Sequence, residues 1–435
     1  MEYIISPWEA EMFIQNLQIC ELENIGTKGW FESHKKLMLL NQQSVLEINA
    51  FREESIKEWF VSFKKVRNVI PILIYEAIQT DIWKHKVFPF LLDINGEPKN
   101  TFMLFSIFYH EDIAVSLLEN VLFHSESAVT MEDTVLDLVD YALIYWVLSL
   151  TNNMYENTLV VSAVKFCYLY MIILISSCLA EILEKKNELE FDIGIRCISI
   201  LRYLAEFFDS LPLCVVSRML ATHDVPYLLT QIIESHPWKK ENEDDGAVSK
   251  IEGQIWIGLR ELLLNPKCAP YYEITEHRLS HLLKLQKYLH DDMLDQMSPL
   301  IDLKRWLSYL SLSSSSYSAP CAVNVEIIPQ IRLSIMEKYR KKWKKVAKHQ
   351  SKFIFSNDVE YIKNTAQILS DAYDLDKFDS IDPKECFLCK EVAKKRCSKC
   401  KSAWYCGREC QVKDWEKHKN ICDKITKSKE DKEQN

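Results

Sequence analysis

Glycine is scarce in this chain, with 8 residues in 435, or under 2%. Typical usage is about 7%. Nucleotide-binding α/β folds and Greek-key β folds need glycine at tight turns and where the backbone approaches a ligand. The chain has no GxGxxG or GxxxxGK[ST] motif, and only Gly407 lies beyond Gly258. The composition therefore argues against these folds and predicts an all-α protein with an irregular multi-helix body that resembles a helical array.

Apolar residues recur at spacings of three and four in six segments, which predicts helices. The segments are Glu9–Leu22, Trp59–Ile78, Glu132–Leu150, Leu159–Leu183, Asp192–Phe208 and Gln254–Leu264. At the first of them, Ser6 is the expected N-cap, Pro7 takes the first helical position and Glu9 closes a capping box. This N-terminus lacks the charged and apolar regions of a signal peptide.

Residues 166–180 form a run of 15 uncharged residues. A membrane-spanning helix usually needs about 18 apolar residues or more. We therefore expect a buried core helix and no stable membrane insertion. Extending the run back to Leu159 gives 22 residues with one lysine, so the sequence leaves open whether 159–180 is a core or a membrane-associated helix.

Polar and low-complexity stretches divide the chain. We expect a helical body over 1–312, a Ser- and Pro-containing loop over 313–328, a basic helical segment over 329–370, a linker over 371–385, a cysteine-rich segment over 386–422 and a charged disordered tail over 423–435. The serine run Ser313–Ser316 marks the first boundary and Pro383 lies just before the cysteines. Pro329 predicts the start of a helix that runs to about Gln350.

Charge is distributed unevenly, although the whole chain has a formal net charge of −9. Residues 384–435 carry 15 basic and 9 acidic residues, which gives +6. The other 38 basic and 53 acidic residues give −15 to residues 1–383. An acidic body with a short basic tail is not typical of a general nucleic-acid binder, so we expect no nucleic-acid partner.

One predicted helix is strongly basic. Its charged residues surround Tyr339 and Trp343 and are Lys338, Arg340, Lys341, Lys342, Lys344, Lys345 and Lys348. One interpretation is a surface that binds phosphates or acidic groups. We favour a solvated helix face whose Tyr339, Trp343 and Val346 pack inward, because basic runs on exposed helices are common.

Fourteen cysteines fall into two sets of seven. One set is scattered, mostly through apolar helical segments, and is expected to behave as small buried hydrophobic residues. It comprises Cys20, Cys167, Cys178, Cys197, Cys214, Cys268 and Cys321. The other set crowds into residues 386–422. Without a secretory signal, such crowding predicts metal binding in a reducing compartment in preference to disulfides.

Eight candidate zinc ligands follow one another in the C-terminal segment. They are Cys386, Cys389, Cys397, Cys400, Cys406, Cys410, His418 and Cys422. Thiolate and imidazole are the donors that zinc prefers, and eight of them make two tetrahedral sites closed by four protein ligands each. We therefore predict two Zn²⁺ ions with a structural role. The spacing leaves open whether the ligands pair sequentially or in an interleaved order.

No catalytic constellation accompanies these ligands. The run His110-Glu111-Asp112 resembles half of a zinc-protease motif, but HExxH requires a second histidine where Ala114 stands. A GxSxG nucleophile motif is also absent from the sequence. We therefore expect that the protein is not an enzyme.

The ligand spacing resembles the MYND zinc finger over its whole length. The resemblance implies interleaved sites, with the Cys386, Cys389, Cys406 and Cys410 ligands on one zinc and the Cys397, Cys400, His418 and Cys422 ligands on the other. It also implies docking of extended, often Pro-containing peptides, with partner-binding roles for Gln411 and Trp415. These two residues are four apart and share a helical face. The alternative is that Trp415 only covers the zinc ligands.

Several stretches of the body resemble the BLU family, whose members carry a C-terminal MYND-type zinc finger and take part in axonemal dynein-arm preassembly. The stretches occur in the same order and are Trp83–Pro89, Glu132–Tyr141, Ser217–His223, Gly253–Ile257 and Ala347–Gln350. The segment Asn153–Leu183 fits this resemblance least well.

The resemblance to the BLU family implies a non-catalytic, co-chaperone-like adaptor for building the dynein arms of motile cilia. Its finger would bind a leucine-rich-repeat dynein assembly factor, and its body would work with chaperones on axonemal dynein chains as clients. The implied location is cytoplasmic, with enrichment near centrioles or basal bodies. The alternative is a nuclear transcriptional corepressor adaptor that binds Pro-rich peptides through the same finger.

Overall fold

The computed structural model forms two compact units, residues 5–372 and residues 373–435 with 1–4. It describes residues 4–63, 68–98, 101–145, 178–235, 248–312, 327–356 and 358–370, and, in the C-terminal segment, residues 386–389, 393, 395–397, 399, 403–415, 417–419 and 422. The division falls inside the predicted linker over 371–385, which is outside the described residues. The segment predicted over 329–370 belongs to the same compact unit as the body. The other predicted boundaries stay predictions.

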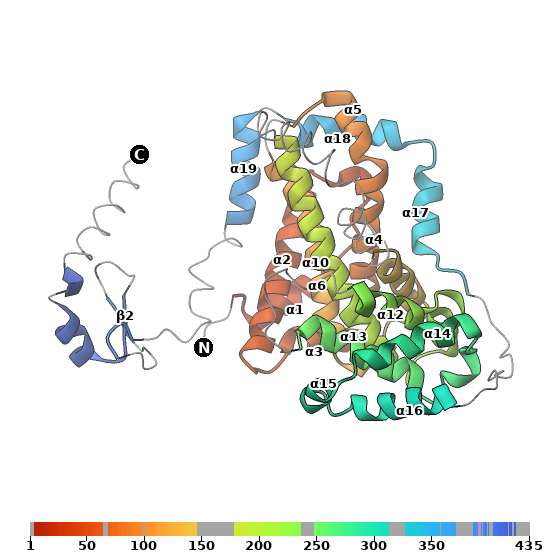
Figure 1. Cartoon of the computed structure of the whole chain (residues 1–435). Helices are drawn as coiled ribbons and strands as arrows, with labels where there is room; N and C mark the ends of the chain where they lie inside the picture. The colour runs from red at the N-terminus through yellow and green to blue at the C-terminus, as the bar shows by residue number, and fades with distance from the viewer. Residues whose placement is uncertain are drawn as a thin grey trace, which may run out of the picture. The chain divides into compact units, whose positions relative to one another are not determined.

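Helices build the described part of the larger unit, which confirms the all-α prediction (Figure 1). Its N-terminal helices are α1 (Pro7–Gln15), α2 (Lys28–Asn49), α3 (Ser55–Ser62), α4 (Ile70–Lys86), α5 (Phe88–Asn95), α6 (Phe102–Leu122) and α7 (Ser125–Val129), followed by helical residues 134–145. The next are α10 (Cys178–Glu206), α11 (Leu213–Ser217), α12 (Val225–Ser235), α13 (Lys250–Leu264), α14 (Glu276–Lys284), α15 (Asp291–Gln296) and α16 (Leu300–Leu312). The last are α17 (Ile331–Tyr339), α18 (Trp343–Ile354) and α19 (Val359–Ser370).

Helix α6 lies at the centre of the larger unit and packs against α2, α4 and α10. Of its 21 residues, 16 are buried. A helix buried on nearly every face carries apolar residues on all sides, so it shows little of the three-and-four periodicity that marks a half-exposed helix. For this reason the spacing pattern did not identify α6. It also missed the long helix α2, in which 12 of 22 residues are buried. A second layer forms where α13 packs against α10, α12 and α16.

A buried ion pair crosses this centre. The Nζ atom of Lys84 in α4 lies 2.6 Å from a carboxylate oxygen of Glu111 in α6, and both side chains are at most 1% exposed. The Tyr141 hydroxyl donates a hydrogen bond of 2.6 Å to the same carboxylate, and Lys84 also lies 3.3 Å from Glu190 of α10. Burial alone would lower the pKa of Lys84, but the carboxylates of Glu111, Glu190 and Asp81 raise it. Lys84 therefore stays charged and links helices from four parts of the chain.

The C-terminal helices return to the N-terminal ones: α17 packs on α4, α18 on α5 and α19 on α2 (Figure 1). The amide of Gln350 in α18 is fully buried. Its Nε2 donates to the backbone oxygen of Leu22 at 2.6 Å, and its Oε1 accepts from Nε1 of Trp83 at 2.8 Å. Gln350 and Trp83 lie in two of the stretches that resemble the BLU family, and they meet across 267 positions of the sequence.

Two more of these stretches meet at Asp140. The guanidinium of Arg218 donates to both carboxylate oxygens of Asp140, at 2.6 and 2.7 Å. Nε2 of His223 lies 2.8 Å from the same carboxylate. A two-pronged arginine contact fixes both distance and orientation. Four of the five stretches are thus paired in space, which is a physical reason for their joint appearance in the sequence.

The predicted helix over Glu9–Leu22 is correct at its start and wrong in its length. The side chain of Ser6 and that of Glu9 form the expected capping box. Helix α1 nevertheless ends at Gln15. The loop that follows is held by α4, because the Cys20 N–H donates to Glu76 at 2.8 Å and its carbonyl accepts from Gln79 at 2.6 Å.

Two other segments were predicted as single helices, and each of them forms two helices. The pattern over Trp59–Ile78 spans the end of α3 and the start of α4, where Pro71 stands in the first turn. Proline in a helix interior would clash with the preceding turn, so the chain starts a new helix there. The helix predicted from Pro329 to Gln350 breaks between Tyr339 and Trp343, which separates α17 from α18.

The remaining helical predictions have mixed outcomes. Residues 134–145 are helical, Asp192–Phe208 falls almost entirely in α10, and Gln254–Leu264 lies in α13. Residues 166–177 of the apolar run, and most of Leu159–Leu183, lie outside the described residues, while residues 178–180 begin α10. Across the described ranges, no helix combines the length and apolar character needed to cross a membrane.

The scattered cysteines lie in or near the helical core. Cys197 and Cys268 are buried, and Cys20, Cys178 and Cys214 are half-buried. Burial, with a smaller effect of Glu261, raises the pKa of Cys268 to about 12. The Cys268 thiol therefore stays protonated and packs as a small apolar group. Cys167 and Cys321 are outside the described residues.

A substitution at Gly26 tests the packing of the C-terminal helices. Gly26 has φ of 86°, and an added Cβ would lie 2.8 Å from Cγ1 of Ile354 in α18. We expect Gly26→Ala to lower the free energy of unfolding by about 1–3 kcal/mol, through backbone strain and overpacking. Urea unfolding followed by far-UV circular dichroism measures this. The matched control is Gly29→Ala in the first turn of α2, where nothing lies within 4 Å; equal losses in both variants would contradict the packing.

A pH dependence follows from His34 of α2, which is fully buried with its Nδ1 atom 2.9 Å from Nδ1 of His110. Burial, and then the charge of His110, lowers the pKa of His34 well below its usual value. Below pH ~6.5 the His34 side chain therefore binds a proton in the unfolded chain but not in the folded one. The free energy of unfolding consequently decreases as the pH falls below that value. We expect the unfolding free energy to fall by up to about 1.4 kcal/mol per pH unit from this group. His34→Gln should flatten that dependence in urea unfolding between pH ~7 and ~5, and parallel profiles would argue against it.

Candidate metal centre

A short hairpin organises the cysteine-rich segment. Its strands β1 (Lys395–Arg396) and β2 (Trp404–Tyr405) pair antiparallel, with Arg396 opposite Trp404. The Phe387 N–H donates to the Trp404 carbonyl at 2.9 Å, which fixes the first CxxC turn against β2. The Cys397 N–H donates to the Ala403 carbonyl at 2.9 Å, and helical residues 408–415 follow. No residue pattern in the sequence predicted this hairpin.

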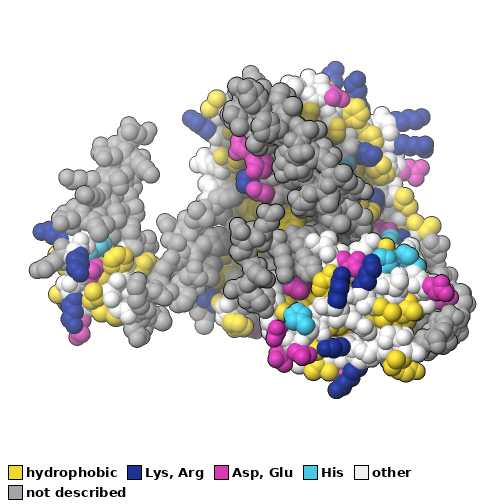
Figure 2. Space-filling view, in the orientation of Figure 1, with side chains coloured by type: hydrophobic (Ala, Val, Ile, Leu, Met, Phe, Trp, Pro, Cys, Tyr) yellow, Lys and Arg dark blue, Asp and Glu magenta, His cyan; other side chains and the backbone are white. Residues whose placement is uncertain are grey.

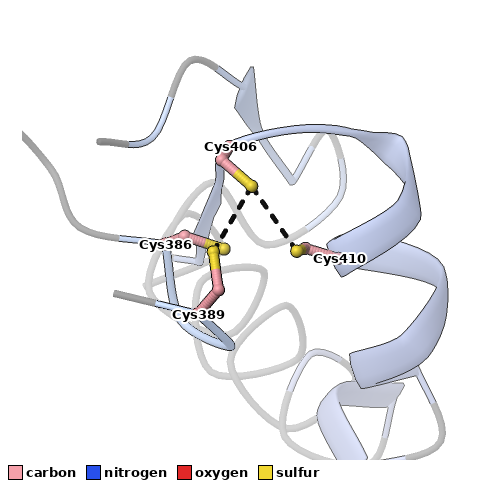
Figure 3. Close-up of side chains that lie close together, drawn as sticks. All are labelled: Cys386, Cys389, Cys406 and Cys410. Carbon is pink, nitrogen blue, oxygen red and sulfur yellow. Dashed lines mark hydrogen bonds between the residues drawn. The ribbon is translucent and has the colours of Figure 1, made fainter. Parts of the chain in front are cut away.

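The first ligand group joins two parts of this scaffold. The sulfur atoms of Cys386, Cys389, Cys406 and Cys410 lie within 4.8 Å of one another (Figure 3). The Cys406 sulfur is 3.5 Å from that of Cys389 and 3.4 Å from that of Cys410. Four sulfurs bound at about 2.3 Å around a tetrahedral zinc would be about 3.8 Å apart. The group therefore fits one zinc ion.

The second group is more deeply buried. Ligand atoms of Cys397, His418 and Cys422 lie within 4.8 Å of one another, and these residues are at most 3% exposed. The sulfurs of Cys397 and Cys422 are 3.9 Å apart. Cys400 lies outside the described residues, and its role as the fourth ligand stays a prediction. Cysteines and a histidine closed off from solvent are typical of a structural zinc site.

The two groups are interleaved along the chain, as the resemblance to the MYND finger implies. Cys386 and Cys389 meet Cys406 and Cys410, while Cys397, which lies between these pairs, meets ligands further on. Folding either group therefore encloses part of the other. Together the two groups fit two structural zinc ions.

The first group needs a cation to ionise fully. Burial opposes ionisation of Cys386, but the backbone N–H groups of Cys389, Cys406 and Leu388 lower its pKa to about 6. The adjacent Cys406 thiol, with burial and the other cysteines, raises the pKa of Cys410 to about 12. Thiolates this close repel one another, and a divalent zinc ion offsets that repulsion.

A buried Tyr–Asp pair links the hairpin to the helix between the two groups. Tyr405 is fully buried, and its hydroxyl donates a hydrogen bond of 2.7 Å to Asp414, which is 3% exposed. The Tyr405 ring also lies edge-on to the ring of His418, at 6.1 Å. Sequence reasoning missed both residues. The available signals were an aromatic residue directly before Cys406 and a carboxylate four positions after Cys410.

The predicted partner-binding residues lie on the helix after the hairpin. Gln411 is half-buried and Trp415 is 39% exposed. The Trp415 ring also lies 6.0 Å from the ring of His418. Trp415 thus presents apolar surface to solvent while it contacts a zinc ligand, and both of its predicted roles stay predictions. Other exposed apolar residues of this segment are Phe387, Leu388 and Val412.

Comparison with known proteins defines the class of this protein. Residues 386–422 match the MYND finger family. The chain is 32% identical over 463 aligned positions to the "Zinc finger MYND domain-containing protein 10 homolog" of Drosophila melanogaster, and the match covers 97% of this chain and 99% of that protein. The fold and the metal centre therefore define a helical protein with a C-terminal MYND zinc finger. The chain belongs to the family of zinc finger MYND domain-containing protein 10, the BLU family.

Shorter matches involve another group of proteins. The chain is 51% identical over 39 residues to protein CBFA2T2 of Xenopus laevis, which covers 9% of this chain and 7% of that protein. It is 26% identical over 100 residues to human CBFA2T2, covering 23% and 16%. No solved structure gives a significant match to the chain.

The Tyr405–Asp414 contact gives a test of the finger. Tyr405→Phe removes the hydroxyl donor and leaves the Asp414 carboxylate buried without it, which costs about 1–3 kcal/mol. We expect the variant to release zinc to a competing chelator at lower chelator concentration than wild type, with the body's helical circular dichroism unchanged. Trp404→Phe in the same strand, where the side chain is only half-buried, is the control. Identical zinc release by wild type and Tyr405→Phe would show that the contact adds no stability.

Proposed function

We propose that this protein is a non-catalytic cytoplasmic adaptor for the preassembly of axonemal dynein arms. Membership of the BLU family and the MYND finger support a protein-interaction adaptor. The dynein-arm role is the one implied by the resemblance of the body and the finger to that family. A closed metal centre fits this role, because four protein ligands on a zinc ion leave no position for substrate or activated water.

The observation that carries the proposal is the length of the family match. Body and finger match together, over 97% of the chain. A protein that shared only the finger would match over the 37 residues of 386–422, as the 39-residue similarity to CBFA2T2 of Xenopus laevis nearly does. The body therefore supports the dynein-arm adaptor over the alternative of a nuclear transcriptional corepressor.

Under this proposal the two compact units have different tasks. The finger binds a leucine-rich-repeat dynein assembly factor, with Trp415 as an exposed apolar anchor and Gln411 as a hydrogen-bonding group for a peptide backbone. The helical body works with chaperones on axonemal dynein chains. We place these steps in the cytoplasm, with enrichment near centrioles or basal bodies.

Affinity capture from ciliating cells tests the finger's part. We expect Trp415→Ala to lose the leucine-rich-repeat factor at least tenfold in captured amount, because truncation of an exposed aromatic anchor typically costs about 2 kcal/mol or more. Elemental analysis should show that the Trp415→Ala variant retains two zinc ions. Cys406→Ala should lose the same partner together with zinc.

Lys413→Ala is the matched control, because Lys413 is exposed on the same helix and two positions from both Gln411 and Trp415, away from their shared face. It should capture the partner as wild type does. Normal capture by Trp415→Ala would assign Trp415 a structural role only. Recovery of the protein mainly on chromatin would favour the corepressor.

A further inference from the structure

A dense basic cluster lies where α17 meets α18. Six of the nine residues from Arg340 to Lys348 are Lys or Arg, and none is acidic. The break between the two helices falls inside this run, so the charges lie around a corner and along the first turns of α18. We call this surface the basic corner; its residues are Arg340, Lys341, Lys342, Lys344, Lys345 and Lys348.

The corner is held in place by buried neighbours. Tyr339, just before it, is 1% exposed and donates a hydrogen bond of 3.1 Å to Glu21. Val346 and Ala347 are buried, and Gln350 is fixed between Leu22 and Trp83. Binding a partner here would therefore cost little ordering of the backbone, because its geometry is already fixed.

The charged side chains point outward. All six residues of the basic corner are exposed, and Figure 2 shows Lys and Arg side chains protruding over the edge where α17 and α18 meet. Among the described residues, none of the six forms an ion pair. Clustering unpaired like charges costs self-repulsion, which a partner of opposite charge would relieve.

Some other surface lysines of the body have an acidic partner within 4 Å, and they are spread over several helices instead of clustered. Such pairs are Lys57–Glu58, Lys185–Glu188, Lys267–Asp209, Lys284–Glu234, Lys304–Asp291 and Lys338–Glu21. The last pair lies directly beside the corner and shows that an acidic side chain is accommodated there.

The negative charge of the rest of the body favours a short acidic partner over a long one. Residues 1–383 carry −15, of which the basic corner contributes +6, so the remainder carries −21. A long polyanion such as RNA, or an anionic membrane, would extend beyond the corner and meet this acidic surface. A short acidic stretch of a protein can lie along the corner without that repulsion.

We propose that the basic corner is a second docking surface, which binds a short Asp- and Glu-rich segment of a partner protein. It lies on the helical body and does not involve the finger. The inference therefore goes beyond the adaptor function proposed above and does not depend on the partner of Trp415.

Fluorescence anisotropy with the full-length protein tests this proposal. The probe is a labelled peptide rich in Asp and Glu, and the comparison peptide has Asn and Gln at those positions. We expect wild type to bind only the acidic peptide, more weakly as salt is raised. Each exposed ion pair contributes up to about fivefold in affinity, so the triple variant Lys341→Gln, Lys344→Gln and Lys345→Gln should bind about tenfold more weakly or worse.

The matched control carries Lys250→Gln, Lys267→Gln and Lys287→Gln, which removes the same charge from exposed sites elsewhere on the body. It should bind within about twofold of wild type, and Trp415→Ala should bind as wild type does. Failure of wild type to bind, or an equal loss in the control, would overturn the proposal. Tighter binding of single-stranded RNA or of phosphatidylserine vesicles, sensitive to the corner variant, would also overturn it.

Discussion

The ion pair between Lys84 and Glu111 is the constraint around which the helical body is built. Its two charges are at most 1% exposed, so each depends on the other, and removing one partner of such a pair typically costs about 3–5 kcal/mol. Tyr141 and Glu190 complete the surroundings of the pair from two further helices. These polar contacts are satisfied only when α4, α6, α10 and residues 134–145 adopt one arrangement, which gives specificity to a core otherwise made of interchangeable apolar contacts.

In the finger, bound metal takes the stabilising role that buried side-chain contacts have in the body. Among the described residues of the finger, the buried apolar cluster consists of Cys386, Cys397, Ala403, Tyr405 and Cys422, and the three cysteines are predicted zinc ligands. So small an apolar core cannot offset the loss of chain entropy, and the free energy of zinc binding takes its place. Zinc binding thus supplies stability that the apolar core of the finger does not, and its exposed side chains do not have to contribute to a core.

Much of this could be predicted where chemistry is local in the sequence. The seven ligand residues that the structure groups, the capping box of Ser6 and Glu9 and the all-α class follow from residue type and short spacing. Helix α6 was missed because full burial removes its periodicity. The bond from Trp83 to Gln350 and the contact of Tyr405 with Asp414 were missed for a different reason: no local rule relates a polar residue to a partner that approaches it only after folding.

The sequence by itself determined the donors, their number and the charge of each segment, because these are properties of residue type alone. Only the tertiary structure decided that the ligands group in an interleaved order, that Gly26 must accept the close approach of Ile354, and that the basic run over 340–348 lies where the chain turns between α17 and α18. Each of these depends on which parts of the chain are brought together, and that is decided by packing over the whole unit.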